Sequence, residues 1–164
     1  MPDQPTGKTK HAELTLDQIA SLLPGLGALM PQVGDRWWIS YYAVLGGNWA
    51  LAGHELRELG KLLEQGSITR PKYAPQLTMF IRSHVGKLLK LVEDRDLKGF
   101  KDAFTAATDA ANTYHRQLGH AEIIWQLPPE PPAQLDLRPQ PGAAATGGES
   151  PGAPSAGPPG RSLP

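Results

Sequence analysis

The sequence predicts an all-α protein, an antiparallel up-and-down four-helix bundle followed by a disordered Pro/Gly-rich tail. Three observations support this fold class. Apolar residues recur at steps of three and four over most of residues 14–127, which is the period of an amphipathic helix. No run of alternating β-branched residues occurs, so we expect no strand. The links between the helical segments are short, and short links favour antiparallel neighbours.

Composition divides the 164 residues into three parts. Residues 128–164 contain eleven prolines and six glycines and show no apolar periodicity. Such a segment buries too little apolar surface to offset the entropy of ordering the chain, so a disordered tail is expected there. Residues 1–13 are expected to form a flexible arm. The bundle domain then covers residues 14–127, enough chain for one modest core.

The first two predicted helices differ in length. The first begins at Thr15, which forms a capping-box pattern with Gln18, and residues 24–27 (Pro-Gly-Leu-Gly) interrupt it. The second is expected to run unbroken from a cap at Asp35 to Gln65. Its predicted core stripe steps by four and three along the helix: Trp38, Tyr42, Leu45, Trp49, Ala52, Leu56, Leu59 and Leu63.

The third and fourth helices follow proline and aspartate signals. The third is expected after the proline-containing loop at residues 69–75 and to end near Asp94. The fourth is expected to begin after Asp96 as its cap and to continue to about Leu118. Its core-facing side is rich in alanine, which allows either close helix packing or space for a ligand.

Composition also limits the function. Basic and acidic residues balance at 16 each, so nothing favours nucleic acid or an anionic membrane as a partner. The absence of cysteine excludes disulfides, thiolate metal sites and thioether-bound haem. The N-terminus has no apolar signal-peptide region and no stretch reaches the roughly 18 apolar residues of a membrane span. A cytoplasmic location is therefore expected.

Two histidines fall on predicted apolar stripes, His84 on the third helix and His115 on the fourth. Each is either a packed residue with hydrogen-bonded nitrogens or a ligand, since imidazole binds transition metals and haem iron. His120 lies about 140° around an unbroken helix from His115 and should not share a ligand with it. Glu55 borders the second stripe, where it either reaches solvent or orients an interior histidine.

Aromatic residues gather on the second helix around Trp38, Tyr42 and Trp49, with Asn48 at the border of the same face. Such a cluster either fills the core or lines a flat cavity opposite the alanine-rich face of the fourth helix. The sequence leaves both interpretations open.

The stretches YYA at 41–43, GNWALA at 47–52, ELREL at 55–59 and AANTYH at 110–115 resemble small bacterial four-helix c-type cytochromes, the cytochrome c′ class. In that class a Cys-x-x-Cys-His motif lies on the last helix, and its histidine is the axial haem ligand. The resemblance implies a bundle in which His115 is placed near a haem site. Ala111 and Tyr114 stand at the two cysteine positions, so covalent haem is excluded.

Three functions remain after this reading. The first is a non-enzymatic bundle that binds a protein partner or a small apolar ligand. The second is non-covalent haem or metal binding through His115, with or without His84. The third is an enzyme with one of these histidines as general base and Glu55 as its orienting group. We favour the first, because no phosphate-binding loop, HExxH or Glu-x-x-His motif occurs.

Overall fold

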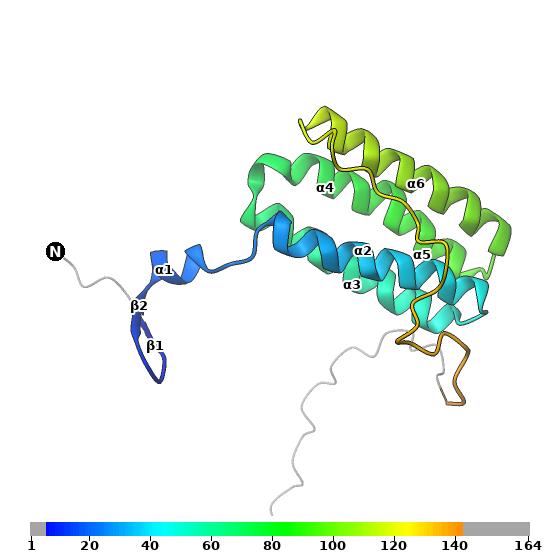
Figure 1. The fold of residues 1–164 in the computed structure, drawn as a ribbon, viewed down its shortest axis with the longest axis horizontal. Helices are drawn as coiled ribbons and strands as arrows, with labels where there is room; N and C mark the ends of the chain where they lie inside the picture. Colours follow the sequence, from blue (N-terminus) through cyan, green and yellow to red (C-terminus); the bar gives the residue numbers. More distant parts are fainter. Residues whose placement is uncertain (1–5, 143–164) are drawn as a thin grey trace, which may run out of the picture.

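The computed structural model describes residues 6–142, and this part of the chain is mainly helical, as predicted. Residues 1–5 of the predicted arm and 143–164 of the predicted tail lie outside it. Figure 1 shows the arrangement. The elements in chain order are β1 (Thr6–Lys8), β2 (Glu13–Thr15), α1 (Leu16–Ser21), α2 (Leu26–Leu45), α3 (Trp49–Thr69), the 3-10 turn η1 (Pro71–Tyr73), α4 (Ala74–Phe80), the π-helical turn η2 (Ile81–Val85), α5 (Gly86–Glu93) and α6 (Leu97–Gln117).

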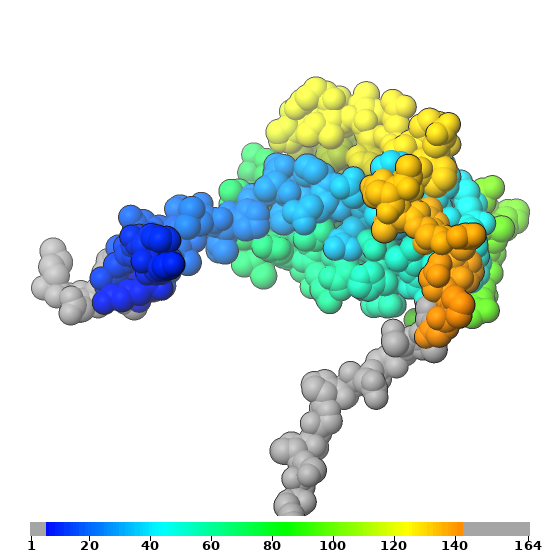
Figure 2. Space-filling model, turned by 60° about the horizontal axis from the view of Figure 1, so that its bottom comes forward, coloured from blue at the N-terminus to red at the C-terminus, as the bar shows by residue number. Residues whose placement is uncertain are grey.

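The N-terminal arm contains a small antiparallel sheet that the sequence pattern did not predict. Strands β1 and β2 pair with Thr6 opposite Thr15. These strands are three residues long, too short to show the alternation by which strands are recognised. Thr15 and Gln18 form the predicted capping box of α1, but α1 buries no residue and lies away from the other helices (Figures 1 and 2).

The prediction of one unbroken helix over residues 35–65 is wrong. The chain reverses at residues 46–48, so that α2 and α3 run side by side in opposite directions (Figure 1). Gly47 has a φ of +77°, a conformation that glycine adopts without a steric penalty. The Asn48 side chain then caps α3 by accepting a hydrogen bond from the Leu51 backbone N–H at 3.1 Å. Helix α2 also begins earlier than predicted, at Leu26 rather than after Asp35.

The predicted core stripe is correct on α3 and displaced by one residue on α2. Ala52, Leu56, Leu59 and Leu63 are buried, whereas Leu45 is exposed. On α2, Trp37 and Val44 face the core, whereas Trp38 and Leu45 were predicted to do so. The predicted stripe assumed one continuous helix. Because the chain turns at residues 46–48, the residue spacing that fits α3 does not extend to α2, and the core positions of α2 lie one residue earlier.

The predicted third and fourth helices are confirmed. The third is the continuous run α4–η2–α5, and the fourth is α6, whose cap Asp96 accepts from the Gly99 N–H at 2.9 Å. Successive helices run in opposite directions, with α2–α3 below and α6 above α4–α5 in the view of Figure 1. Within residues 6–142, no helix combines the length and apolarity needed to cross a membrane.

Trp37 joins α2 to the opposite layer of helices. Its ring stacks on Phe104 of α6 at 4.3 Å between centroids and tilts against Phe80 of α4 at 5.9 Å. Its indole N–H donates to the Thr108 hydroxyl at 3.1 Å, so the only polar atom of the ring has a partner. A single buried side chain of α2 therefore contacts two other helices, α4 and α6.

The first part of the predicted disordered tail has a defined path. After α6 the chain returns along the outside of the molecule and crosses α2, as Figures 1 and 2 show; we call residues 126–138 the strap. Backbone carbonyls of Pro128, Glu130 and Arg138 accept hydrogen bonds from helix side chains at 2.7, 2.9 and 3.1 Å. Pro132 is buried. The composition of the strap did not predict this defined path, because the side chains that donate the hydrogen bonds lie on α2 and at the turn that follows it.

Two glycine substitutions should change stability in opposite directions. Gly47→Ala forces a side chain into a positive-φ position and should destabilise the protein by about 1 kcal/mol. Gly60→Ala lies inside α3 with no atom within 4 Å of the added methyl group and should stabilise it by about 0.5–1 kcal/mol. Urea unfolding measures the free energy of unfolding of both variants. Equal changes in the two variants would contradict the positive-φ turn at Gly47.

Candidate ligand-binding cavity

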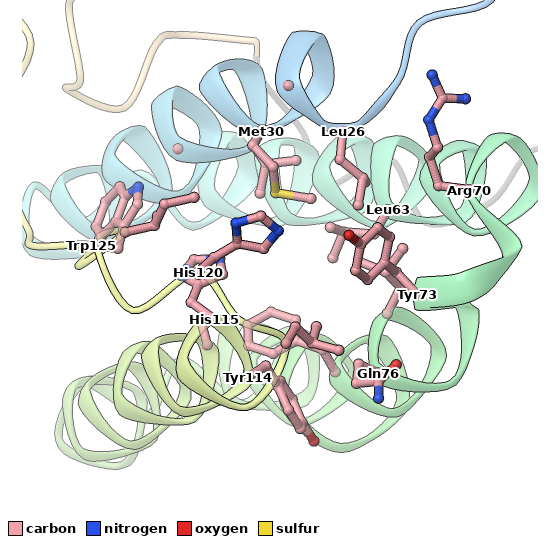
Figure 3. A pocket seen from close by; sticks show the side chains of 18 of the residues that line it. Leu26, Met30, Leu63, Arg70, Tyr73, Gln76, Tyr114, His115, His120 and Trp125 are labelled. Atoms are coloured by element: carbon pink, nitrogen blue, oxygen red, sulfur yellow. The ribbon is translucent and has the colours of Figure 1, made fainter.

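One end of the molecule carries a cavity of about 720 Å³ that is open to solvent on one side. It lies where α2 and the end of α3 face α4 and α6, and Figure 3 shows it from close by. The wall is mainly apolar and draws on all four of these helices, with Leu26, Met30, Leu63, Leu77, Phe80 and Ala111 among its residues. A concave apolar space of this size is typical of small-molecule binding sites.

Small residues on α2 shape the wall of this cavity. Gly25, Gly27 and Gly34 all line it. A side chain at Gly34 would place its Cβ 2.9 Å from the Trp125 indole nitrogen, so only glycine lets that ring pack there. Trp125 comes from the segment after α6 and thus closes one side of the cavity against α2.

Only three of the residues predicted as site candidates line the cavity: Ala111, Tyr114 and His115, all on α6. These three residues lie on the side of α6 that faces the cavity. Trp37, one position before the predicted Trp38, lines the cavity as well.

Trp38, Tyr42 and Asn48 do not line the cavity and hold the strap instead. The Trp38 indole N–H donates to the Glu130 carbonyl, the Tyr42 hydroxyl to Pro128, and the Asn48 amide to Arg138. They were predicted to bind a ligand because the stripe was extended through the turn at residues 46–48. The structure places their side chains against the strap and not in this cavity. Trp49, a further candidate, is partly buried against the core.

Glu55 orients no histidine. It is buried and forms an ion pair with Arg36 of α2 at 2.7 Å, which supplies the partner that a buried carboxylate requires. Glu58 pairs with Lys61 at 2.7 Å, and this hydrogen bond lowers the pKa of Glu58. The hypothesis of a His–Glu55 catalytic pair therefore loses its orienting group.

His84 does not share the cavity with His115. It lies in the π-helical turn η2, with its ring 5.1 Å from that of Phe80, and it is not among the lining residues. Burial lowers the pKa of His84, and the charge of Lys87 acts in the same direction. His54 is exposed, as predicted.

His115 has a buried polar atom without a partner. Its Nδ1 is fully buried and makes no hydrogen bond within the described residues. Burial lowers the pKa of His115, a backbone contact with Ile123 opposes part of that shift, and the charge of His120 adds to it. Because this nitrogen has almost no accessible surface, a molecule in the cavity does not reach it without a shift of the neighbouring atoms.

His120 also lines the cavity, although the helix geometry appeared to separate it from His115. Helix α6 ends at Gln117, and Gly119 has a φ of +88°. The His120 N–H returns to the His115 carbonyl at 2.8 Å, closing the helix with a glycine turn. The missed signal was Gly119, whose position just after an apolar residue is that of a helix stop.

Asn112 fixes the chain that follows this turn. It is buried, its amide N–H donates to the Trp125 carbonyl at 3.0 Å, and its carbonyl accepts from the Trp125 N–H at 2.7 Å. This two-bond clamp holds the Trp125 backbone on α6. Neither residue was a sequence candidate, because a pair thirteen residues apart leaves no periodic signal.

Charged and polar groups are few and unevenly placed around the cavity. Among the described lining residues none is Asp, Glu or Lys, and Arg70 lies at the rim with its side chain directed outward in Figure 3. Gln76 Oε1 is buried and has no hydrogen-bond partner there. Within residues 6–142, no cluster of three His, Cys, Asp or Glu residues is arranged to hold a metal ion.

Comparisons of the chain with protein-family models, curated proteins and solved structures gave no match. Functional inference therefore depends on the geometry of the cavity.

Removal of the Asn112 clamp should loosen the cavity wall. Asn112→Ala deletes two hydrogen bonds to Trp125, each contributing about 1 kcal/mol, so we expect a loss of about 1–3 kcal/mol in unfolding free energy. Gln117→Ala, at the exposed end of α6, is the control and should change little. Denaturant unfolding followed by tryptophan fluorescence measures both; equal stability of the two variants would contradict the clamp.

Stability should fall on mild acidification. Burial lowers the folded-state pKa of His84 and His115, so the unfolded chain takes up protons first as the pH falls below about 6.5. The melting temperature should therefore decline between about pH 7 and pH 5. The double variant His84→Gln/His115→Gln should decline less over this window, whereas the exposed His54→Gln should follow the unchanged protein.

Proposed function

We propose that this chain is a non-enzymatic four-helix-bundle protein that binds a small, mainly apolar molecule. The four helices of the proposed bundle are α2, α3, α4–α5 and α6. One observation carries the proposal, the cavity of about 720 Å³ with a largely apolar wall at one end of the helices. Burial of an apolar ligand there contributes about 25 cal/mol for each Å² removed from water.

Two contacts define the wall of the proposed site. Trp37 and Phe80 both line the cavity, and their ring centroids lie 5.9 Å apart. The Asn112 clamp holds Trp125 in the wall. His115 lies in the same wall, and the few polar residues of apolar pockets are the ones that orient a ligand.

Binding of the fluorescent probe N-phenyl-1-naphthylamine tests this proposal. Ala111→Leu places extra side-chain volume into the cavity and should weaken probe binding by about tenfold or more, because filling the space removes ligand contacts. Ala106→Leu on the exposed side of α6 is the matched control and should bind like the unchanged protein. Equal binding by both variants would place the probe elsewhere and refute the proposal.

A second candidate is non-covalent haem, which the resemblance to the cytochrome c′ class raised. The placement of His115 favours it, because this histidine lies in the wall of the cavity. His84 offers no second ligand, whereas His120 lines the same wall. A visible-absorption titration with haemin distinguishes the candidates: a saturable Soret shift that weakens in His115→Ala supports haem, and an identical response from both proteins excludes His115 as the ligand.

A further inference from the structure

The exposed residues of the cavity wall mark its opening, and one of them is charged. Gly27, Pro31, Arg70 and Ile123 line the cavity and are exposed to solvent. Of these four, only Arg70 carries a charge, and the described lining contains no Asp, Glu or Lys. The opening of a largely apolar cavity is therefore positively charged.

Contacts between the end of α3 and the start of α2 hold Arg70 at this opening. Helix α3 ends at Thr69, whose hydroxyl donates to the Pro24 carbonyl at 3.1 Å, just before α2 begins. The Arg70 guanidinium packs on Gly25, where an added Cβ would lie 2.5 Å from Nη2. Gly25 is itself a wall residue, so these contacts place the charge beside the wall (Figure 3).

The Arg70 guanidinium has hydrogen-bond donors to spare. Its Nη1 donates to the Thr69 carbonyl at 2.6 Å, which uses one of its five N–H groups. The ion pairs formed among residues 6–142 include neither Arg70 nor Lys72. Lys72 lies over the ring of Tyr73, a lining residue, at 5.2 Å. Two cations of one turn thus add positive potential at the opening.

An amphipathic anion matches both the wall and the opening. A hydrocarbon tail would leave water and pack on wall residues such as Met30, Leu63 and Phe80. A carboxylate head group would stay at the opening and keep much of its hydration, because Arg70 is exposed. A guanidinium can bind a carboxylate through two parallel hydrogen bonds. An ammonium head group would instead meet a like charge.

We propose that the ligand is a monocarboxylate with a long hydrocarbon tail, of the fatty-acid class. Its tail occupies the cavity, and its carboxylate pairs with Arg70 at the opening. Contacts with the apolar wall supply most of the affinity, and Arg70 selects the charge of the head group. This inference rests on the proposed function, because it specifies the ligand of the same cavity.

Competition against bound N-phenyl-1-naphthylamine near neutral pH tests the inference with three compounds of matched chain length. Decanoate is an anion, decan-1-ol is uncharged, and decylammonium is a cation. Arg70→Gln removes the charge and keeps a polar side chain. The decanoate concentration that displaces half of the probe should rise about two- to fivefold in this variant, the effect of one exposed ion pair. The value for decan-1-ol should stay unchanged, and that for decylammonium should fall.

Arg95→Gln is the matched control. Arg95 is also exposed and lies in the turn between α5 and α6, at the opposite end of the helices from Arg70 (Figure 1). All three compounds should displace the probe from this variant as they do from the unchanged protein. At about 1 M NaCl the difference between Arg70→Gln and the unchanged protein should shrink, since salt screens exposed charges. Melting temperatures confirm that both variants are folded.

Different failures have different meanings. If Arg70→Gln leaves the decanoate value unchanged, the inference is overturned while the proposed function stands. If the variant weakens decan-1-ol as much as decanoate, Arg70 packs on the tail and does not bind the head group, which also overturns the inference. If neither the probe nor decan-1-ol binds the unchanged protein, the proposed function fails and this inference fails with it.

Discussion

The contacts of Trp37 set the spacing between the two layers of helices. Its indole lies between Phe80 and Phe104 and is held by the Thr108 hydroxyl, so α2 has one fixed separation from α4 and α6 at that level. On one side of this tryptophan the buried residues fill the core, with Val44, Leu88 and Phe100 among them. On the other side the cavity lies between the same helices, and its wall includes Gly27, Gly34 and Ala111 beside larger apolar residues.

The sequence predicted helical content well and chain reversal poorly. A period of 3.6 residues identifies the apolar face of a helix. Apolar residues continue at this period on both sides of the turn at Gly47, so periodicity alone could not show where α2 ends and α3 begins. The evidence lay in Gly46-Gly47-Asn48, two glycines followed by a good N-cap residue. The capping signals at Thr15 and Asp96 gave correct helix starts, whereas the one at Asp35 was wrong because Asp35 lies inside α2.

The candidate site was predictable only where it lies on one regular helix. Ala111, Tyr114 and His115 share a face of α6 and were found by their spacing. The remaining wall comes from residues that tertiary structure brings together: Trp125 through the Asn112 clamp, and His120 through the glycine turn. Gly119 is a local signal for the glycine turn, whereas no local pattern encodes the Asn112–Trp125 contact, because it joins a helix to irregular chain.

The strap shows that a proline-rich segment can be ordered without secondary structure. Proline has no N–H to satisfy, and the strap carbonyls receive donors from Trp38, Tyr42 and Asn48. The segment is anchored at one end where Trp125 packs over Gly34 and at the other where Arg138 meets Asn48. Its length is therefore constrained more tightly than its composition: deletion of even a few residues between these anchors would pull one of them out of place. The number of residues between Trp125 and Arg138 is thus a constraint of its own on this segment.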